Sequence, residues 1–141
     1  MLKISDAVNL GFHAMAILGS DRNGRRYSVI ELAGHLNASE NHLAKIMQRL
    51  SRQGLVQSKR GPSGGFVLAR SPAEITLLEI YEAIDGPLPD RSCLMDHPIL
   101  GEHRCLYGDL LKTIQEQVSR HLRTTTLEAI AIQPEAYEQA V

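Results

Sequence analysis

The spacing of apolar residues predicts a helix over residues 4–18, in which hydrophobic side chains occur almost all the way round. A helix without a broad polar face is typically buried on several sides, for instance between its own domain and a partner subunit. Its polar exceptions, Asp6, Asn9 and His13, follow the i, i+3, i+7 spacing and therefore form one stripe. Residues 19–24 are rich in turn formers and end this helix.

Two short helices joined by a tight turn are predicted next. Ser28 caps the first, with Glu31 three residues later as its capping-box partner, and Ser39 caps the second, which runs from residue 40 to about residue 53. The second helix has apolar residues at the i, i+3, i+4, i+7 positions Leu43, Ile46, Met47 and Leu50. Its other face carries polar and basic side chains, namely Asn41, His42, Lys45, Gln48, Arg49 and Arg52. This is the helix-turn-helix arrangement, whose second helix reads the major groove of DNA.

A β-hairpin is predicted to follow directly. Residues 55–59 and 66–69 are its two strands, and the loop between them contains three glycines and one proline. Lys59 and Arg60 lie at its tip, where they could reach phosphates or a minor groove. An ordinary hairpin with a solvated basic turn has the same pattern, but the position after a helix-turn-helix favours a DNA-binding wing.

The sequence pattern in the second half of the chain predicts two more helices separated by a loop. Thr76 and Glu79 form a capping box for a helix that runs to about Ile84. A long helix follows the loop, with Asp109 in its first turn and another cap expected at Thr125 and Glu128. Its apolar stripe consists of Leu110, Leu111, Ile114, Val118 and Leu122. We expect this helix to pair with its copy in a homodimer, the alternative being that it packs back on its own domain.

These elements define a mainly α fold with a small β-wing. We expect a winged helix-turn-helix domain at residues 1–85, a cofactor or sensor loop at 86–108, a dimerisation helix region at 109–133 and a flexible tail at 134–141. No apolar run approaches the ~18 residues that a membrane span needs, and the N-terminus lacks the pattern of a signal peptide. A cytoplasmic protein without a membrane partner is therefore expected.

Charge is distributed unevenly along the chain. The net charge of −1 arises from +6 over residues 1–70, with ten Lys/Arg and four Asp/Glu, and −7 over residues 71–141, with five Lys/Arg and twelve Asp/Glu. A basic N-terminal half is what a phosphate-binding surface requires, whereas the acidic half would avoid DNA. The charge pattern thus supports double-stranded DNA as the partner of the first half.

Several stretches resemble the IscR/NsrR-type regulators, winged-helix proteins many of which carry an iron–sulphur cluster. The most specific is the wing sequence RGPSGGF at residues 60–66 with LAR at 68–70. Residues 1–5, 10–15, 43–46 with Leu50, 54–56 and 80–86 are also similar. The resemblance implies sequence-specific operator binding as a homodimer, usually as a repressor. Ser39, Asn41, His42 and Lys45 match the groove-facing start of the recognition helix, and Arg60 matches the minor-groove residue of the wing. Arg49 and Lys59 complete the candidate DNA-binding residues.

The resemblance also implies a sensor site in the loop. Cluster-binding members have three cysteines there, whereas this chain has Cys93 and Cys105, with Ile99 midway between them. His97 and His103 in the loop are chemically able to bind metal, as are Asp96 and Glu102. His13 matches a position from which a few relatives reach a cluster across the dimer. Asn9 falls where those relatives have a carboxylate, and an amide is a poor iron ligand.

Three interpretations of the loop remain open. Cys93 and Cys105 could hold an iron–sulphur cluster, with 2Fe–2S favoured over 4Fe–4S, and His13, His97 or His103 would complete the ligand set. The two cysteines could instead form a disulfide under oxidative stress. A small-molecule effector or a bound zinc is the third. An enzyme with a Cys/His catalytic pair is disfavoured because no oxyanion-hole motif accompanies these residues, and the basic wing disfavours a pure protein-interaction adaptor.

Overall fold

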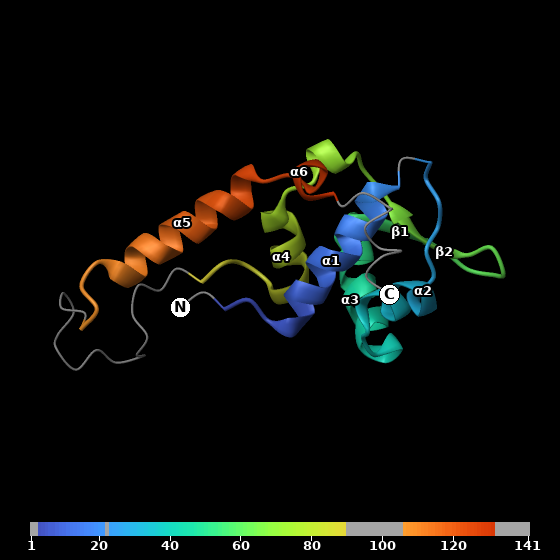
Figure 1. Cartoon of the computed structure of the whole chain (residues 1–141), viewed down its shortest axis with the longest axis horizontal. Helices are drawn as coiled ribbons and strands as arrows, with labels where there is room; N and C mark the ends of the chain where they lie inside the picture. Colours follow the sequence, from blue (N-terminus) through green and yellow to red (C-terminus); the bar gives the residue numbers. More distant parts are fainter. Residues whose placement is uncertain (1–2, 22, 90–105, 132–141) are drawn as a thin grey trace.

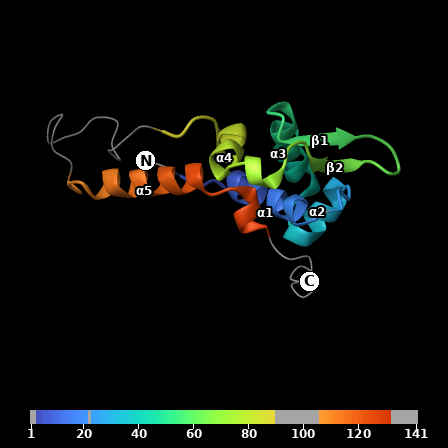
Figure 2. The same cartoon turned by 90° about the horizontal axis from the view of Figure 1, so that it is seen from above.

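The computed structural model describes residues 3–21, 23–89 and 106–131 of the chain. Their elements, in order, are α1 (Asp6–Ser20), α2 (Val29–Leu36), α3 (Glu40–Arg52), β1 (Val56–Lys59), β2 (Gly65–Leu68), the 3₁₀ helix η1 (Pro72–Glu74), α4 (Leu77–Asp85), α5 (Leu110–Thr124) and α6 (Leu127–Ile130). We call α1 to α4 with η1 and α6 the head, and β1 and β2 with the loop between them the wing. The wing and α5 extend from opposite ends of the head (Figures 1 and 2). The predicted mainly α fold with a small two-stranded wing is confirmed.

Side-chain caps start α2, α3 and α4 where the sequence predicted them, but the capping box expected of Ser28 and Glu31 forms only in part, because the Glu31 carboxylate pairs with Arg25 instead. The Ser28 hydroxyl accepts a hydrogen bond from the backbone N–H of Glu31, and the Ser39 hydroxyl accepts one from His42. Thr76 and Glu79 form the complete reciprocal capping box of α4. Each cap satisfies a backbone donor that the first helical turn would otherwise leave unpaired.

The core of the head is organised around α1, which packs against α2, α3, α4 and α6. Met15 and Ile17 are almost completely buried, together with Leu43, Met47 and Leu50 of α3. Gly11 lets α1 approach α4 closely, because a Cβ atom at this position would overlap the side chain of Ile84. The buried face of α3 therefore consists of the apolar residues that its periodicity predicted.

The helix α1 is buried on several sides, as its sequence predicted, but the described chain leaves one side of it open. The polar stripe of Asp6, Asn9 and His13 is exposed. Small and apolar side chains fill the rest of the helix surface, but no element of the described chain covers this stripe. His13 is therefore not a core histidine of the single chain.

The wing is an antiparallel pair in which Val56 lies opposite Leu68 and Lys59 lies opposite Gly65. Its base is joined to the head by Tyr27, which exchanges two backbone hydrogen bonds with Phe66, at 3.0 and 2.8 Å. Gly65 has a φ of +139°, and a Cβ atom there would lie 2.7 Å from the carbonyl oxygen of Tyr27. A glycine is required at this contact for both reasons.

The chain returns to the head after α5. The N–H of Leu77 donates to Thr125, and the N–H of Leu127 donates to Ile75, at 3.0 and 2.8 Å. Leu127 is completely buried in the core of the head. The expected cap at Thr125 is corrected to Thr126, because this pairing with the start of α4 keeps Thr125 extended as the residue that ends α5. The end of the region predicted for dimerisation thus packs within the DNA-binding domain.

The apolar stripe of α5 is divided between two environments. Leu111 and Leu122 are buried, and Leu122 belongs to the core of the head. Leu110 and Ile114 are 55% and 40% exposed. Asp109 occupies the position before the helix rather than its first turn, and its side chain forms no capping hydrogen bond. Part of the stripe therefore packs on its own domain, and part is left uncovered by the residues that the structure describes.

None of the helices in the described ranges has the length and hydropathy needed to cross a membrane.

Candidate nucleic-acid interface and sensor residues

The exposed face of α3 carries the residues that the sequence assigned to base reading. Ser39, Asn41, His42 and Lys45 are all exposed and belong to the first half of the helix or to its cap. The buried face of the same helix anchors it on α1, α2 and α4. Because helix side chains four residues apart share a face, Asn41 and Lys45 lie in one line. The structure therefore brings these four predicted residues together on one surface.

Arg49 departs from this group. Its Nη1 donates a 3.0 Å hydrogen bond to the carbonyl oxygen of Ile84 in the last turn of α4. Carbonyl groups at the end of a helix lack partners within that helix and carry partial negative charge, so a guanidinium is a favourable partner for them. The side chain that the sequence assigned to DNA is thus used to join α3 to α4.

Lys59 and Arg60 are exposed at the end of β1 and the start of the wing loop. Between the wing and the second half of α3 lies a hollow of about 470 Å³. Its lining includes both of these residues as well as Gln48, Ser51, Arg52, Ser58, Gly65 and Phe66. The wing and the recognition helix therefore form one continuous polar and basic surface.

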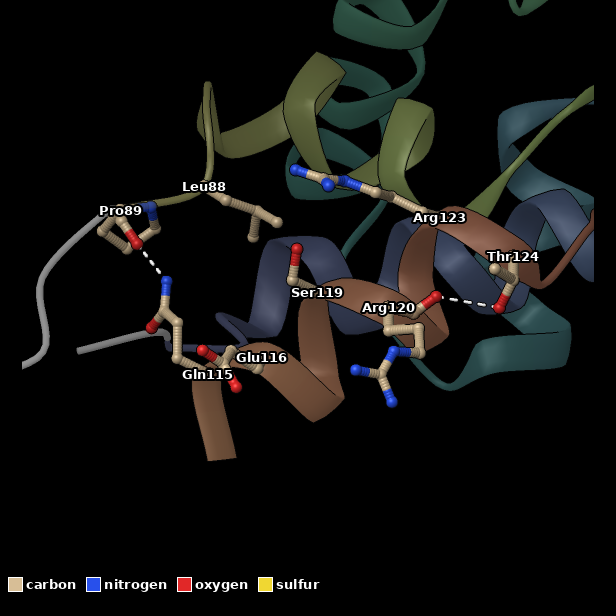
Figure 3. Close-up of a pocket in the computed structure, with 8 residues that line it drawn as sticks. All are labelled: Leu88, Pro89, Gln115, Glu116, Ser119, Arg120, Arg123 and Thr124. Carbon is tan, nitrogen blue, oxygen red and sulfur yellow. Dashed lines mark hydrogen bonds between the residues drawn. The ribbon is translucent and has the colours of Figure 1, made fainter. Parts of the chain in front are cut away.

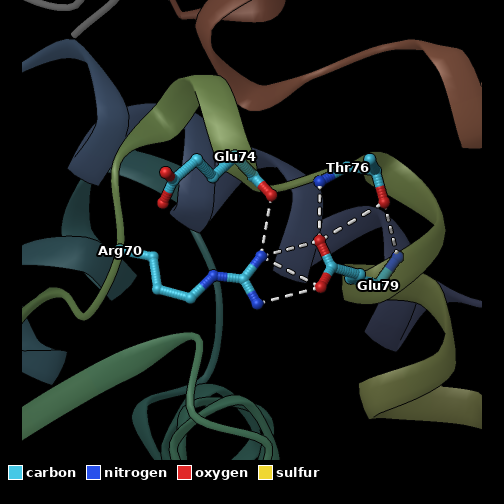
Figure 4. Close-up of polar contacts among 4 residues, drawn as sticks. All are labelled: Arg70, Glu74, Thr76 and Glu79. Atoms are coloured by element: carbon cyan, nitrogen blue, oxygen red, sulfur yellow. Dashed lines mark hydrogen bonds and ion pairs between the residues drawn. The ribbon is translucent and has the colours of Figure 1, made fainter.

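The segment that follows β2 is joined to α4 by an ion pair between Arg70 and Glu79 (Figure 4). The sequence did not predict this pair. Both terminal nitrogens of Arg70 donate to the Glu79 carboxylate at 2.9 Å, and Nη2 also donates to the carbonyl oxygen of Glu74 at 2.7 Å. The hydrogen bond from Arg70 holds the pKa of Glu79 below its usual value, against the opposite effect of partial burial. The same carboxylate accepts the backbone N–H of Thr76 in the capping box. Arg70 and the Thr76/Glu79 box are each visible in the sequence, but only the fold shows that they meet.

His13 is the one candidate sensor residue that lies within the described ranges. Its Nδ1 is 2.7 Å from the backbone carbonyl oxygen of Asn9. A carbonyl only accepts hydrogen bonds, so Nδ1 carries the hydrogen, and in the neutral imidazole the lone pair belongs to Nε2. This is the arrangement in which a metal-binding imidazole is normally held, with the second nitrogen fixed by a carbonyl or carboxylate.

The other proposed ligands, Cys93, Asp96, His97, Glu102, His103 and Cys105, lie outside the described residues. Among the residues that are described, no group of three or more His, Cys, Asp or Glu side chains is placed to hold a metal ion. His13 therefore supplies a single potential ligand within the described chain.

A second hollow, of about 550 Å³, lies between the segment after α4 and one face of α5. Ser119 and Arg123 extend from α5 on the side where Leu88 lies, whereas Arg120 points away from them (Figure 3). The side-chain amide of Gln115 donates to the carbonyl oxygen of Pro89 and ties α5 to this segment. The first residues of the segment predicted as the sensor loop thus contact the long helix.

An exposed polar recognition helix beside a basic wing defines the winged helix-turn-helix class of DNA-binding transcription regulators. Comparison with known proteins agrees with this class. The chain belongs to the Rrf2 family, described as iron-dependent transcriptional regulators, which matches residues 4–133. This family membership and the relatives below confirm the resemblance to IscR-type proteins, and they identify the chain as a regulator rather than an enzyme.

Relatives and solved structures support the assignment over most of the chain. A protein of Aquifex aeolicus named as an HTH-type transcriptional regulator is 32% identical over 127 residues, which are 88% of either protein. The regulator IscR of Xenorhabdus nematophila is 30% identical over 102 residues, which are 72% of this chain and 62% of IscR. The structure of CymR, the global cysteine regulator of B. subtilis, superposes with a TM-score of 0.77 at 32% identity and covers 93% of this chain and 97% of CymR. The structure of T. potens IscR, at 24% identity and a TM-score of 0.69 over 99% of this chain and 92% of that one, shares the fold.

Proposed function

We propose that this protein is a repressor that binds a specific operator as a homodimer. The observation that carries the proposal is the common exposure of Asn41, His42 and Lys45 on α3 beside the basic wing. In this arrangement α3 enters the major groove and the wing contacts the adjacent minor groove. A repressor of this kind acts by occupying DNA that the transcription machinery needs.

The residue types on α3 suit base reading. An asparagine side chain can form a bidentate pair with adenine, and lysine can donate to the O6 and N7 atoms of guanine. The side chains of Asn41 and Lys45 form no hydrogen bond or salt bridge with the described residues, so both are available for such contacts. Arg60, at the start of the wing loop, is suited to a narrow minor groove, whose negative potential attracts arginine.

The uncovered apolar residues of α5 support the homodimer. Leu106, Tyr107, Leu110 and Ile114 are between 40% and 80% exposed and lie at the end of α5 that extends from the head (Figure 1). Burying them against the same residues of a second chain removes apolar surface from water. A two-fold dimer of this kind would bind a palindromic operator with half-sites about one helical turn, or a multiple of it, apart.

Control of the operator complex is assigned to Cys93 and Cys105. Their thiolates and the imidazole of His13 are the ligand types of clusters with mixed cysteine and histidine ligation, and His13 is exposed with its Nδ1 bound to the Asn9 carbonyl, which leaves Nε2 as the ligand atom. When bound, such a cluster supplies reversible one-electron chemistry and reactivity toward oxygen or nitric oxide. The role of His13 itself is to offer a nitrogen ligand from α1, the helix at the centre of the head. A ligand set that includes α1 would couple the sensor to the position of the DNA-reading elements.

A thiol switch is the second candidate function. It is favoured by the presence of two loop cysteines rather than three and by the similarity to CymR, a global cysteine regulator. A peroxide would oxidise the two thiols to one disulfide. In this step hydrogen peroxide would be reduced to two water molecules, and an alkyl hydroperoxide to an alcohol and water. The disulfide would change DNA affinity without a metal.

Purification without oxygen distinguishes these candidates. A cluster gives brown protein with absorption at about 300–500 nm and equal amounts of iron and sulphide, a signature of the cysteine-bound clusters. Cys93→Ala, Cys105→Ala and His13→Ala should then each reduce the iron content, with His35→Ala as the matched histidine control. Protein that stays colourless after reconstitution, yet loses operator binding reversibly on peroxide treatment, supports the thiol switch. Protein that binds no operator selected from a random duplex library, in any redox state, contradicts the proposed function as a whole.

A further inference from the structure

The hollow between α3 and the wing carries a feature beyond the residues predicted to touch DNA. Gln48, Ser51 and Arg52 line it from the second half of α3, and Ser58, Lys59 and Arg60 line it from the wing. Gln48 and Arg52 lie four residues apart and so continue the line of Asn41 and Lys45 along the same face of the helix. Arg49 in the same half of the helix is bound to the carbonyl oxygen of Ile84. Arg52 is therefore the arginine of this helix half that remains available to contact DNA.

Three cations share this hollow without a counter-ion. Arg52, Lys59 and Arg60 form no salt bridge with any residue of the described ranges, and no acidic side chain contributes to the lining. The hydroxyl groups of Ser51 and Ser58, which also line the hollow, form no hydrogen bond with the described residues. Like charges gathered at one place repel one another unless an anion lies between them. The chemistry of the hollow is therefore that of a receptor for a phosphate group.

The geometry of DNA identifies which phosphate. The major and minor grooves on one side of a duplex are separated by a single sugar–phosphate strand. If α3 occupies the major groove and the wing the adjacent minor groove, this strand must pass between them, and the space between them is the hollow. We propose that Arg52, with Lys59 and the two serine hydroxyls, binds a backbone phosphate of this strand.

This proposal rests on the proposed function and divides the recognition helix into two parts. The first half reads base edges, whereas the second half and the wing hold the strand in a sequence-independent manner. Arg52 therefore sets the position of the helix in the groove and contributes equally to specific and non-specific binding.

The test is a salt titration of DNA binding, with fluorescence anisotropy on a labelled 24-base-pair duplex of mixed sequence and on a selected operator. Loss of one phosphate contact lowers the slope of log K against log salt by about 0.9. When the salt concentration rises from 50 to 200 mM, the loss of DNA affinity should therefore be about threefold smaller for Arg52→Gln than for the wild type. Arg52→Lys, which keeps the charge, should retain the wild-type slope. Arg123→Gln is the matched control, because it removes an equally exposed arginine from α5 at a distance from the wing.

Each result bears on the proposal. A reduced slope for Arg52→Gln on both duplexes, with wild-type slopes for Arg52→Lys and Arg123→Gln, supports it. An unchanged slope and affinity for Arg52→Gln overturns it while operator binding by the wild type leaves the proposed function intact. A loss confined to the selected operator also overturns it, because Arg52 would then read sequence. A wild-type protein that binds neither duplex contradicts the proposed function itself. Circular dichroism of each variant checks that the fold is retained.

Discussion

Leu110→Ala tests whether α5 holds two chains together. Leu110 is 55% exposed in the single chain, so about half of its side chain is available to a partner. Complete burial of a leucine side chain contributes about 1.5–3 kcal/mol, and the available half therefore contributes about 1 kcal/mol. A two-fold axis repeats every contact, which gives about 2 kcal/mol for each dimer. The dissociation constant of the dimer should rise about 30-fold.

Sedimentation equilibrium over a range of protein concentrations measures this constant directly. The matched control is Leu122→Ala on the same helix, because Leu122 is only 4% exposed and belongs to the core of the head. This control should lower the free energy of unfolding by about 2–5 kcal/mol through loss of burial and formation of a cavity. Urea unfolding at two protein concentrations separates the effects, since a weaker dimer makes the unfolding midpoint less dependent on concentration, whereas a loss of core packing lowers the midpoint at both concentrations. A dissociation constant for Leu110→Ala within threefold of the wild type would refute the assignment of this surface to the dimer.

Three further substitutions test the head and the wing. Leu127→Ala should lower the free energy of unfolding by about 2–5 kcal/mol in urea, because the leucine is completely buried although it follows α5; a loss below 1 kcal/mol (roughly that of a surface change) would contradict the packing of α6 in the core. Gly65→Ala should cost about 1–3 kcal/mol in thermal unfolding and weaken DNA binding, since it places a Cβ atom against the Tyr27 carbonyl; an unchanged melting temperature would show that the wing base adapts. Glu79→Gln keeps a side chain that can form the capping box but removes the ion pair with Arg70. Because both side chains of this ion pair are partly exposed, the pair contributes about 1 kcal/mol or less to the free energy of unfolding. Because the folded-state pKa of Glu79 is lowered, this contribution should be present above about pH 4.5 and disappear as the pH falls through the lowered value; a difference between variant and wild type that persists in acid would contradict this origin.

Local sequence signals were sufficient for much of the head. Ser28, Ser39 and Thr76 start helices because their side chains satisfy backbone donors within three residues, and no distant contact is needed for this. The apolar spacing in α3 identified its buried face for a similar reason, since it depends only on the helical repeat. The glycines of the wing loop marked a tight connection that few other residues can form.

Contacts between distant segments could not be predicted in the same way. Arg49 and Arg52 both belong to the basic face of α3, yet only the position of α4 directs Arg49 to the Ile84 carbonyl. The pairing of Tyr27 with Phe66 and the ion pair of Arg70 with Glu79 likewise join residues whose separate patterns gave no sign of each other. Each of these contacts depends on the position of a second helix or strand in space. The spacing of residues along the chain does not specify that position.

The sequence alone thus determined the class of fold, the helix-turn-helix and the wing, and it predicted the residues that would read DNA. The tertiary structure decided which of these side chains remain available, which part of α5 is buried in its own head, and where α6 returns to the core. The physical reason is that periodicity and capping act over a few residues, whereas the burial of a face requires a partner surface from elsewhere in the chain. The exposed His13 stripe and the uncovered end of α5 are positions at which the described residues supply no such surface.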